Sequence, residues 1–408
     1  MFIADFHIHS RYSRATSREM NVETITKWAK IKGIELVGTG DFTHYQWLSE
    51  LEAYLTPSTE GIYHYKGVKF ILTSEISCIF SEAGRVRKIH IMVFAPSFSV
   101  VRKINRELSR IGNLDSDGRP ILGLAARQLV KIIMEISDRC FIVPAHIWTP
   151  HFSMFGANSG FDSIDECFGD QKRHIYTLET GLSSDPKMNW MLSVLDDYTL
   201  ISNSDAHNPQ NIGREANIFN TEIDYNEITT VLKNKDKKKF LGTIEFFPQE
   251  GKYHYDGHRN CDVVLSPSDT RRLNGICPKC RKRLTIGVLN RVYQLADREF
   301  GYTPSNSIPF KSMVPLREII GESVGKTPIC KEVEKIYNCL IENFGSELNV
   351  LINTSIGEIM RLHPRVAEGI DNVRQGRVVP EPGYDGVYGK IRLFKELREE
   401  IPAQMSLF

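Results

Sequence analysis

The first residues that could do chemistry are two histidines, one residue apart, close to the N-terminus. His7 and His9 stand in the run DFHIHS. Side chains two residues apart on a strand point to the same face, so both imidazoles can reach one metal ion. Asp205 and His207, in SDAH, repeat this spacing much later in the chain. An isolated His-x-His pair is weak evidence, so the prediction of a metal site depends on further ligands.

Further potential ligands stand where other apolar runs end. A carboxyl or imidazole group is costly at the end of a buried strand unless it has a partner. A carboxylate such as Glu75 also has two oxygens and can bridge two ions. We therefore predict a site for at least two divalent ions; the alternative is a set of separately satisfied core or surface histidines. The candidate ligands are His7, His9, Asp41, Glu75, His90, His146, Asp205 and His207.

Divalent ions in such a site would activate a bound water, so that hydrolysis there needs no serine or cysteine nucleophile. Metal ions lower the pKa of bound water towards neutrality and offset developing negative charge. We assign catalytic roles to Asp205, Glu75 and His9, with Asp205 also orienting the nucleophile. Arg11 and Arg14 follow the His-x-His pair directly, and a guanidinium group can pair with two phosphate oxygens. Ordinary surface charge is the alternative for both arginines.

The elements that must position these residues alternate between strands and helices from Met1 to about Pro248. Short apolar runs such as IELVGTGD and CFIVPAHI alternate with stretches such as AARQLVKIIMEI, where apolar residues recur every three or four positions. About seven such units predict an α/β barrel of parallel strands rather than an open sheet. The carboxyl ends of barrel strands converge on one mouth, which would bring these distant side chains together.

A second cluster predicts a structural zinc site. Cys277-x-x-Cys280 supplies a close thiolate pair, and His258-x-x-Cys261 supplies the opposite half with matching spacing. His254 is the alternative fourth ligand. A closed four-ligand site has no open position for water, so the role of this zinc should be structural or DNA-contacting rather than hydrolytic.

Basic residues surround the predicted zinc site. Arg281, Lys282 and Arg283 directly follow its last cysteine. Such a patch could bind a phosphate backbone without reading sequence; a solvated basic face is the alternative. The patch is local, because the 408 residues hold 51 Lys and Arg against 50 Asp and Glu. This balance argues against a chain that is basic throughout and binds polyanions over its whole surface.

Composition and length also predict several units in one cytoplasmic protein without a membrane partner. No apolar run is long enough to cross a membrane, and the N-terminus does not resemble a signal peptide. We expect a metal-binding barrel over 1–248, a zinc-binding module over 249–296 and a helical C-terminal domain over 297–403. The module is too short for an ordinary core, so zinc would stabilise it.

The last five residues, 404–408, form a short tail with spaced apolar residues. Gln404, Leu407 and Phe408 resemble the peptide by which DNA-processing proteins dock on the replication sliding clamp. A chain terminus can present such a peptide freely. Packing of this tail on its own domain is the alternative.

The order of the metal-site motifs resembles that of the polymerase and histidinol phosphatase (PHP) superfamily. The motifs are DFHIHS, TGD, TSEIS, KIHIMV, PAH and SDAH. The resemblance implies a distorted (β/α)7 barrel with a multinuclear, usually zinc-containing, phosphoesterase site; Mg2+ or Mn2+ is the alternative metal. It further implies one ion at His7, His9, Glu75 and Asp205, and a second at Glu75, His90 and His146.

The third ion of that superfamily lacks its usual ligands in this chain. The superfamily places a histidine shortly after His-x-His and another directly after the aspartate of the second motif. Here the corresponding residues are SRYSRAT, without histidine, and Phe42 after Asp41. His44 is our candidate substitute, with His207 as its partner.

Three later segments resemble the endonuclease Q family, so that the resemblance covers essentially the whole chain. They are KYHYDGHRNC to ICPKC with LTIGVLNRV, GYTPSNSIPFKSMVPLREII, and EPGYDGVYGKI. The resemblance implies a DNA repair endonuclease that cuts on the 5′ side of deaminated bases (uracil, hypoxanthine, xanthine) and abasic sites. A small-molecule phosphomonoesterase is the first alternative, but it leaves the zinc module and the tail without a role. A non-catalytic, clamp-associated DNA-binding protein is the second, and the near-complete ligand set argues against it.

A long loop after His146 is the candidate pocket for a damaged base, together with the loop GNLDSDGRP. An enzyme of this kind takes the target nucleotide out of the stack, and aromatic side chains can then stack on it. We expect stacking from the loop aromatics and reading of base edges from its polar residues. These residues are Trp148, Phe152, Phe155, Asn158 and Ser159. The alternative is that the aromatics anchor the loop to the barrel rim.

Overall fold

The computed structural model describes residues 1–394. The predicted clamp-binding tail at 404–408 lies outside this range. Within residues 1–394, no helix combines the length and the apolar character that crossing a membrane requires.

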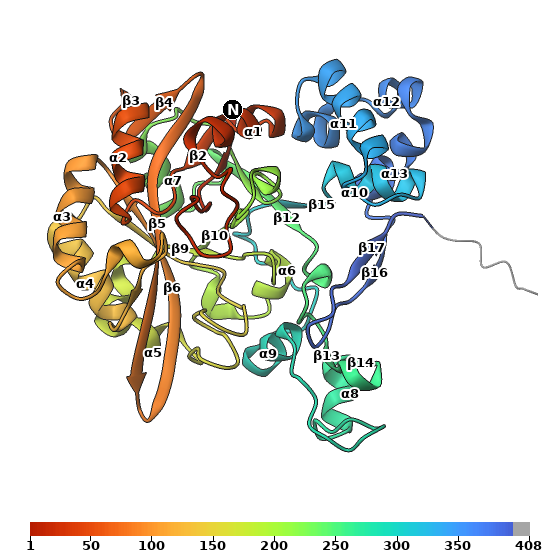
Figure 1. Cartoon of the computed structure of the whole chain (residues 1–408). Helices are drawn as coiled ribbons and strands as arrows, with labels where there is room; N and C mark the ends of the chain where they lie inside the picture. Colours follow the sequence, from red (N-terminus) through yellow and green to blue (C-terminus); the bar gives the residue numbers. More distant parts are fainter. Residues whose placement is uncertain (395–408) are drawn as a thin grey trace, which may run out of the picture.

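Seven strands form a closed, distorted ring in the N-terminal part of the chain (Figure 1). They are β1 (Phe2–Asp5), β2 (Leu36–Gly38), β5 (Val68–Glu82), β6 (Arg85–Ala95), β8 (Phe141–Pro144), β9 (Thr177–Glu179) and β10 (Thr199–Ile201). Parallel pairs join β1 to β2, β2 to β5, and β9 to β10. Single parallel bridges, Ile142 to Ile175 and Ile8 to Ala206, close the ring. The predicted α/β barrel is therefore confirmed.

One strand of the ring departs from the expected parallel order. β6 runs antiparallel to both β5 and β8. β5 and β6 are joined by only Ala83 and Gly84, which both have positive φ (49° and 74°), as the tight turn of a two-residue hairpin requires. In consequence Glu75 and His90 lie in the middle of long strands rather than at strand ends. Ser77 stands opposite His90, so Glu75, two residues away, faces the same side.

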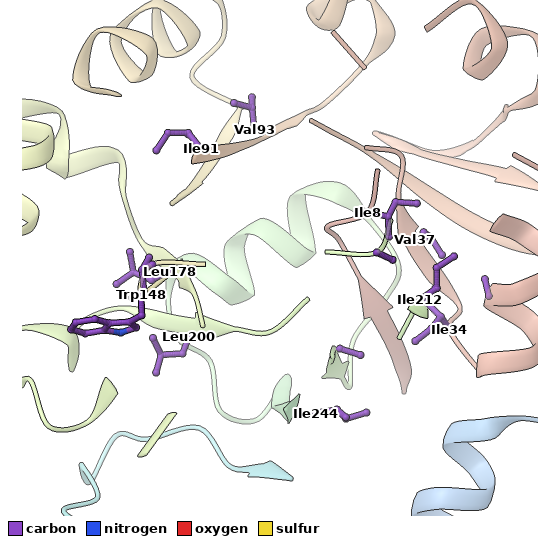
Figure 2. Close-up of a cluster of buried hydrophobic side chains, with 14 of the residues drawn as sticks. Ile8, Ile34, Val37, Ile91, Val93, Trp148, Leu178, Leu200, Ile212 and Ile244 are labelled. Carbon is purple, nitrogen blue, oxygen red and sulfur yellow. The ribbon is translucent and has the colours of Figure 1, made fainter. Parts of the chain in front are cut away.

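Helices cover the outside of the ring and bury their apolar faces against it. They are α1 (Val22–Lys32), α2 (Tyr45–Tyr54), α3 (Phe98–Leu108), α4 (Ala126–Ile136), α5 (Ile164–Phe168), α6 (Pro186–Asn189) and α7 (Tyr225–Lys233). In α4, for example, Leu129, Val130 and Ile133 are buried at the three- and four-residue spacing of one helix face. Side chains from strands that are distant in sequence, such as Ile91, Leu178 and Ile244, belong to one hydrophobic cluster (Figure 2).

Further strands extend the sheet beyond the ring. β11 (Ala216–Phe219) pairs antiparallel with β1, and β12 (Phe240–Phe246) continues outward from it. β3 (Thr56–Thr59), β4 (Ile62–Tyr65) and β7 (Ile121–Leu122) add to β5. β15 (Phe310–Met313) pairs in parallel with β12, although it belongs to the predicted third domain. The predicted boundaries near 248 and 296 therefore remain a proposal.

The remaining elements form two smaller units (Figure 1). The zinc module holds the antiparallel pair β13 (Asp256–His258) and β14 (Val263–Leu265), followed by α8 (Pro267–Arg272) and α9 (Val288–Leu295). The helical unit holds α10 (Leu316–Val324), α11 (Lys331–Phe344), α12 (Ile356–Leu362) and α13 (Pro364–Arg374). A hairpin of β16 (Val379–Glu381) and β17 (Lys390–Arg392), here called the arm, reaches from the helical unit to the zinc module.

A buried ion pair links the helical unit to the barrel. Lys32 Nζ, at the end of α1, lies 2.6 Å from Glu347 Oε2, and both side chains are about 5% exposed. Glu347 also accepts hydrogen bonds from the Tyr337 hydroxyl (2.6 Å) and the Leu316 backbone N–H (3.1 Å). A buried charge that lost such partners would be costly, so this contact holds the two units in a defined relative position.

Candidate metal centre

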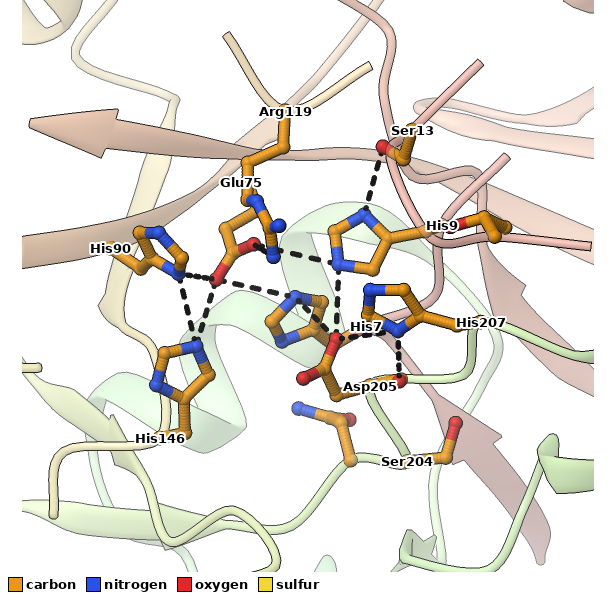
Figure 3. Close-up of polar contacts among 12 residues, drawn as sticks. His7, His9, Ser13, Glu75, His90, Arg119, His146, Ser204, Asp205 and His207 are labelled. Atoms are coloured by element: carbon orange, nitrogen blue, oxygen red, sulfur yellow. Dashed lines mark hydrogen bonds and ion pairs between the residues drawn. The ribbon is translucent and has the colours of Figure 1, made fainter. Parts of the chain in front are cut away.

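The N-terminal half of the centre lies directly after β1, where His7 and His9 face two carboxylates (Figure 3). His9 Nε2 lies 3.0 Å from Asp205 Oδ1 and 3.4 Å from Glu75 Oε2. His7 Nε2 lies 3.7 Å from Glu75 Oε1 and 3.7 Å from Asp205 Oδ1. The bridge from Ile8 to Ala206 brings these segments together, because it aligns the stretch after β1 with the stretch after β10.

The other half gathers around the second oxygen of Glu75. His90 Nδ1 lies 2.7 Å and His146 Nε2 2.9 Å from Glu75 Oε1. The two imidazole nitrogens are 3.2 Å apart. Glu75 thus stands between two pairs of histidines, in the position that a bridging carboxylate needs.

The donor set fits divalent metal ions. Three groups have ligand atoms within 4.8 Å of one another: His7, His9 and Glu75; Glu75, His90 and His146; and His9, Asp205 and His207. Among residues 1–394, buried His7 Nε2, His9 Nε2 and Asp205 Oδ1 make no hydrogen bond, although buried polar atoms normally have partners. These atoms point at one another, and a bound cation would satisfy them. Imidazole and carboxylate ligands suit zinc and manganese, among other ions.

Electrostatics keep the carboxylates in their ligating form. Burial alone would raise the pKa of Glu75, but His90, His7 and Arg119 together hold that pKa well below its usual value. The pKa of Asp205 is likewise lowered, since His7 and His9 outweigh its burial. Burial lowers the pKa of His90 to about 4, against the pull of Glu75. Burial would lower the pKa of the other histidines too, but the carboxylates around them raise the pKa of His7 and His146 and raise that of His9 to about 9. Because metal binds the neutral imidazole, an incoming ion must displace their protons.

Two candidate ligands have strained backbones. His146 and Asp205 have φ of 29° and 46°, a region that non-glycine residues seldom adopt and that recurs at functional sites. Gly181 makes room for the first of them, because a methyl group there would stand 2.4 Å from the His146 Cβ. The barrel frame therefore holds both side chains in orientations that their local sequence does not favour.

Glu179, at the end of β9, supports the centre from behind and was not among the predicted residues. It is fully buried, and its carboxylate lies 3.0 Å from His7 Nδ1. It also accepts hydrogen bonds of 2.8 Å from the His146 backbone N–H and from Asn203 Nδ2. By accepting the Nδ1 proton of His7, it leaves Nε2 free to bind a metal ion. The sequence signal existed, since Glu179 ends the apolar run IYTLETG.

Asp41 and His44 lie outside the three ligand groups, and their role as metal ligands stays a prediction. Asp41 accepts hydrogen bonds from the Ser10 backbone N–H (2.6 Å) and the Ser13 hydroxyl (2.8 Å), and it lies 3.0 Å from His9 Nδ1. In this position Asp41 orients His9. His44 stacks on Tyr12 at 4.4 Å between ring centroids and belongs to none of the three groups.

Arg119 is the arginine that reaches the centre. It comes from the loop GNLDSDGRP, and its Nη1 lies 3.3 Å from Glu75 Oε2 (Figure 3). The two predicted phosphate clamps instead form ion pairs beside the centre. Arg11 pairs with Glu50 at 2.6 Å, and Arg14, mostly exposed, pairs with Asp117 at 3.3 Å.

Two of the predicted base-stacking residues belong to the core, so the prediction is wrong for them. Trp148 and Phe155 are buried (1% and 0% exposed) and pack on each other at 4.8 Å between ring centroids. The Trp148 indole N–H donates to Asn189 Oδ1 at 2.8 Å. They anchor the loop to the barrel, as the alternative interpretation held.

Phe152 brings one part of the long loop close to the metal centre. Phe152 is half-buried and packs on His90 at 4.8 Å between ring centroids. Ser159 is buried, with its hydroxyl 3.4 Å from the Lys88 carbonyl oxygen, so it cannot read a base. Asn158 is exposed. Of the five predicted residues, Phe152 and Asn158 keep an accessible position.

Arg291 of α9 ties this loop to the zinc module. Its Nε donates to the Phe155 carbonyl oxygen and its Nη2 to the Phe161 carbonyl oxygen, both at 3.0 Å. Nη2 also pairs with Asp162 at 2.5 Å. The loop that contacts His90 is thus held from outside the barrel.

The second predicted cluster is assembled in the zinc module. The ligand atoms of His258, Cys261, Cys277 and Cys280 lie within 4.8 Å of one another. His254, the alternative ligand, is buried elsewhere, outside this group, and burial lowers its pKa to about 4. The basic residues next to the cluster, Arg281, Lys282 and Arg283, are exposed.

Comparison with known proteins places this geometry in context. A family model described as the MJ0043 C-terminal domain matches residues 315–377, which hold α10 to α13. The uncharacterized protein MJ0043 of Methanocaldococcus jannaschii is 34% identical over 251 residues, which are 60% of this chain. The chain spans about a third (31%) of the length of that protein. The uncharacterized protein YqxK of Bacillus subtilis is 29% identical over 406 residues, 95% of this chain and 98% of its own.

Two solved structures match over nearly the whole chain. The lesion-specific endonuclease PfuEndoQ from Pyrococcus furiosus is 34% identical, with a TM-score of 0.88, covering 98% of this chain and 97% of its own. An endonuclease Q in complex with a 27-mer duplex substrate with an abasic lesion at its active site is also 34% identical. Its TM-score is 0.86, and the match covers 98% of this chain and 99% of that one.

Proposed function

The chain belongs to the endonuclease Q family, and from this premise we propose that it cuts DNA on the 5′ side of a damaged nucleotide. It is a metal-dependent endonuclease, and its substrate is damaged DNA. The observation that carries the proposal is the position of Glu75 between two pairs of histidines, in a chain that matches the solved endonuclease from Pyrococcus furiosus over 98% of its length.

Each residue of the centre has its own role in the proposed hydrolysis. Divalent ions held by the three groups would supply a water of lowered pKa and offset the charge on the phosphate. Glu75 and Asp205 hold these groups together, and Asp205, partly accessible (27% exposed side chain), orients the nucleophile. Arg119, 23% exposed, pairs with a phosphate oxygen from the opposite side. His7 and His9 are kept in the required tautomer by Glu179 and Asp41.

We further propose deaminated bases, namely uracil, hypoxanthine and xanthine, and abasic sites as the lesions. A deaminated base pairs less well and an abasic site does not pair at all, so moving either nucleotide out of the helix costs less. An abasic lesion occupies the active site of a solved relative. Phe152, which packs on His90, and the exposed Asn158 are the residues of the long loop that can contact the extruded nucleotide.

A panel of oligonucleotides that differ at one position tests the activity. Purified protein with Mn2+, Mg2+ or Zn2+ should nick the damaged strands, and the lesion should stand at the 5′ end of the downstream fragment. The undamaged strand should stay intact. Intact damaged strands together with rapid hydrolysis of p-nitrophenyl phosphate would support the phosphomonoesterase alternative instead.

Asp205→Asn tests the assignment of the centre. The variant keeps the shape of the side chain but removes its charge, and nicking should fall by at least about 100-fold. Asp165→Asn is the matched control, because Asp165 is an exposed residue whose carboxylate pairs with Lys172. Nicking at the wild-type rate by Asp205→Asn would exclude Asp205 as an essential ligand.

Two partner contacts complete the proposal. The basic patch of Arg281, Lys282 and Arg283 would bind the phosphate backbone near the structural zinc. The tail at 404–408 would dock on a DNA sliding clamp. Deleting Gln404 to Phe408 should leave basal nicking unchanged and abolish any stimulation by the clamp; equal stimulation of both proteins would contradict docking.

A further inference from the structure

The tip of the arm carries exposed aromatic and basic side chains that the metal centre does not use. Tyr388 is 67% exposed and Tyr253 39% exposed. Lys252 and Arg259 are exposed too. These four residues, here called the arm-tip surface, come from the arm and from the start of the zinc module, which lie side by side (Figure 1).

The four side chains lie next to one another. Lys252 Nζ stands 4.4 Å from the ring centroid of Tyr388. Arg259 and Tyr253 both approach Gly386. A methyl group on this glycine would stand 3.5 Å from Arg259 Nη1 and 3.7 Å from the Tyr253 hydroxyl oxygen. Within residues 1–394, neither Lys252 nor Arg259 forms an ion pair with an acidic side chain. Both positive charges are therefore available to an anionic ligand.

Hydrogen bonds hold the arm tip rigidly against the zinc module. Asp385 accepts from the Arg259 backbone N–H and from the Thr285 hydroxyl, both at 2.6 Å. The Tyr384 hydroxyl donates to Asp262 at 2.7 Å, and the Gly386 N–H donates to the Lys252 carbonyl oxygen at 3.0 Å. A surface that is ordered in advance loses little entropy when a ligand binds.

We propose that the arm-tip surface binds an unpaired stretch of a nucleic acid strand, with a base stacked on Tyr388 and phosphates beside Lys252 and Arg259. Aromatic rings next to unpaired cations match the alternation of bases and phosphates along a single strand. A base must be unstacked to reach the ring, so the surface favours an unpaired strand over an intact duplex. The inference rests on the proposed function as a DNA endonuclease, and it adds a second contact outside the metal centre.

Binding of an undamaged, fluorescein-labelled oligothymidylate, about 20 nucleotides long, tests the surface by anisotropy. Tyr388→Ala should weaken this binding about tenfold, while Tyr388→Phe, which keeps the ring, should bind like the wild type. Lys252→Gln should lower the slope of log affinity against log salt by about 0.7, the value for one phosphate contact on a single strand. An intact duplex should respond less to Tyr388→Ala.

Tyr302→Ala is the matched control. Tyr302 is 47% exposed and also has a cation over its ring, Arg298 at 4.3 Å. Arg298, however, is paired with both oxygens of Asp196, so its charge is neutralised, and the variant should bind normally. The inference would be overturned if Tyr388→Ala and Lys252→Gln both kept the affinity and the salt slope of the wild type. It would also be overturned if Tyr302→Ala lost as much affinity as Tyr388→Ala.

Nicking of the damaged oligonucleotides, measured on the same proteins, separates the two proposals. If wild type and Tyr388→Ala nick equally and bind the oligothymidylate equally, the arm-tip surface is refuted and the endonuclease stands. If no protein nicks any damaged strand, the proposed function fails, whatever the binding shows. Reduced binding with unchanged nicking of substrate at saturation supports the surface.

Discussion

Glu179→Gln should weaken metal binding although Glu179 belongs to none of the three ligand groups. All its hydrogen-bond partners are donors: His7 Nδ1, the His146 backbone N–H and Asn203 Nδ2. The carboxylate offers two acceptor oxygens, whereas glutamine offers one oxygen and an NH2 group. In the variant the NH2 group must therefore face at least one donor.

The magnitude follows from that mismatch. A hydrogen bond to a charged group contributes about 1.5–3 kcal/mol. If the amide instead donates to His7 Nδ1, the ring proton moves to Nε2, the nitrogen that faces Glu75 and Asp205, and His7 can no longer bind a metal ion. The lost hydrogen bond and the displaced ring proton both predict a metal affinity that is weaker by about 10–100-fold, the usual range for residues that support a metal ligand.

Metal titration against a chromogenic chelator measures this affinity without relying on activity. Glu347→Gln is the control, because it makes the same change at a carboxylate that is equally buried but lies in the helical unit. We expect that control to lose stability and to keep the affinity of the barrel centre. Wild-type affinity in Glu179→Gln, or an equal loss in Glu347→Gln, would refute the reasoning.

Three further perturbations test the parts that surround the centre. Lys32→Met leaves the Glu347 carboxylate buried without its cation and should destabilise the docked helical unit by about 3–5 kcal/mol, measured by hydrogen exchange of α11. Burial raises the pKa of Glu347, but Lys32 lowers it below the usual 4.5. The stabilisation that the Lys32–Glu347 pair gives is therefore present at neutral pH and lost as the pH falls below 4.5. A stability difference between wild type and Lys32→Met that does not change with pH would contradict this. Cys277→Ser combined with Cys280→Ser should remove one zinc ion per chain by elemental analysis, and an unchanged zinc count would reject the four-ligand site. Arg291→Ala should expose the loop around 156–160 to proteolysis, because the loop carbonyls lose their donor; unchanged cleavage would show that Trp148 and Phe155 hold the loop alone.

Much of the metal centre could be predicted from local patterns. The two-residue spacing of His7 and His9 predicts side chains on one face of an extended segment, although both residues lie just after β1. A carboxylate such as Glu75 within an apolar run demands a partner. The zinc cluster could be predicted in the same way, since two close pairs of ligand residues at matching spacing are typical of a structural zinc site. The resemblance to endonuclease Q, carried by segments along the whole chain, agrees with the solved structures.

The sequence by itself determined which residues interrupt the apolar runs and how polar and apolar residues alternate, because those properties depend on neighbours along the chain; it did not show that Glu75 and His90 lie in the middle of long strands. The tertiary structure alone decided which side chains meet. The indole N–H of the buried Trp148 finds its acceptor in Asn189, 41 residues away, and Glu179 supports His7 across 172 residues. Arg119 forms an ion pair with Glu75, whereas Arg11 pairs with Glu50 and Arg14 with Asp117. Closure of the ring determines such contacts, because it brings strand ends together regardless of their separation in sequence.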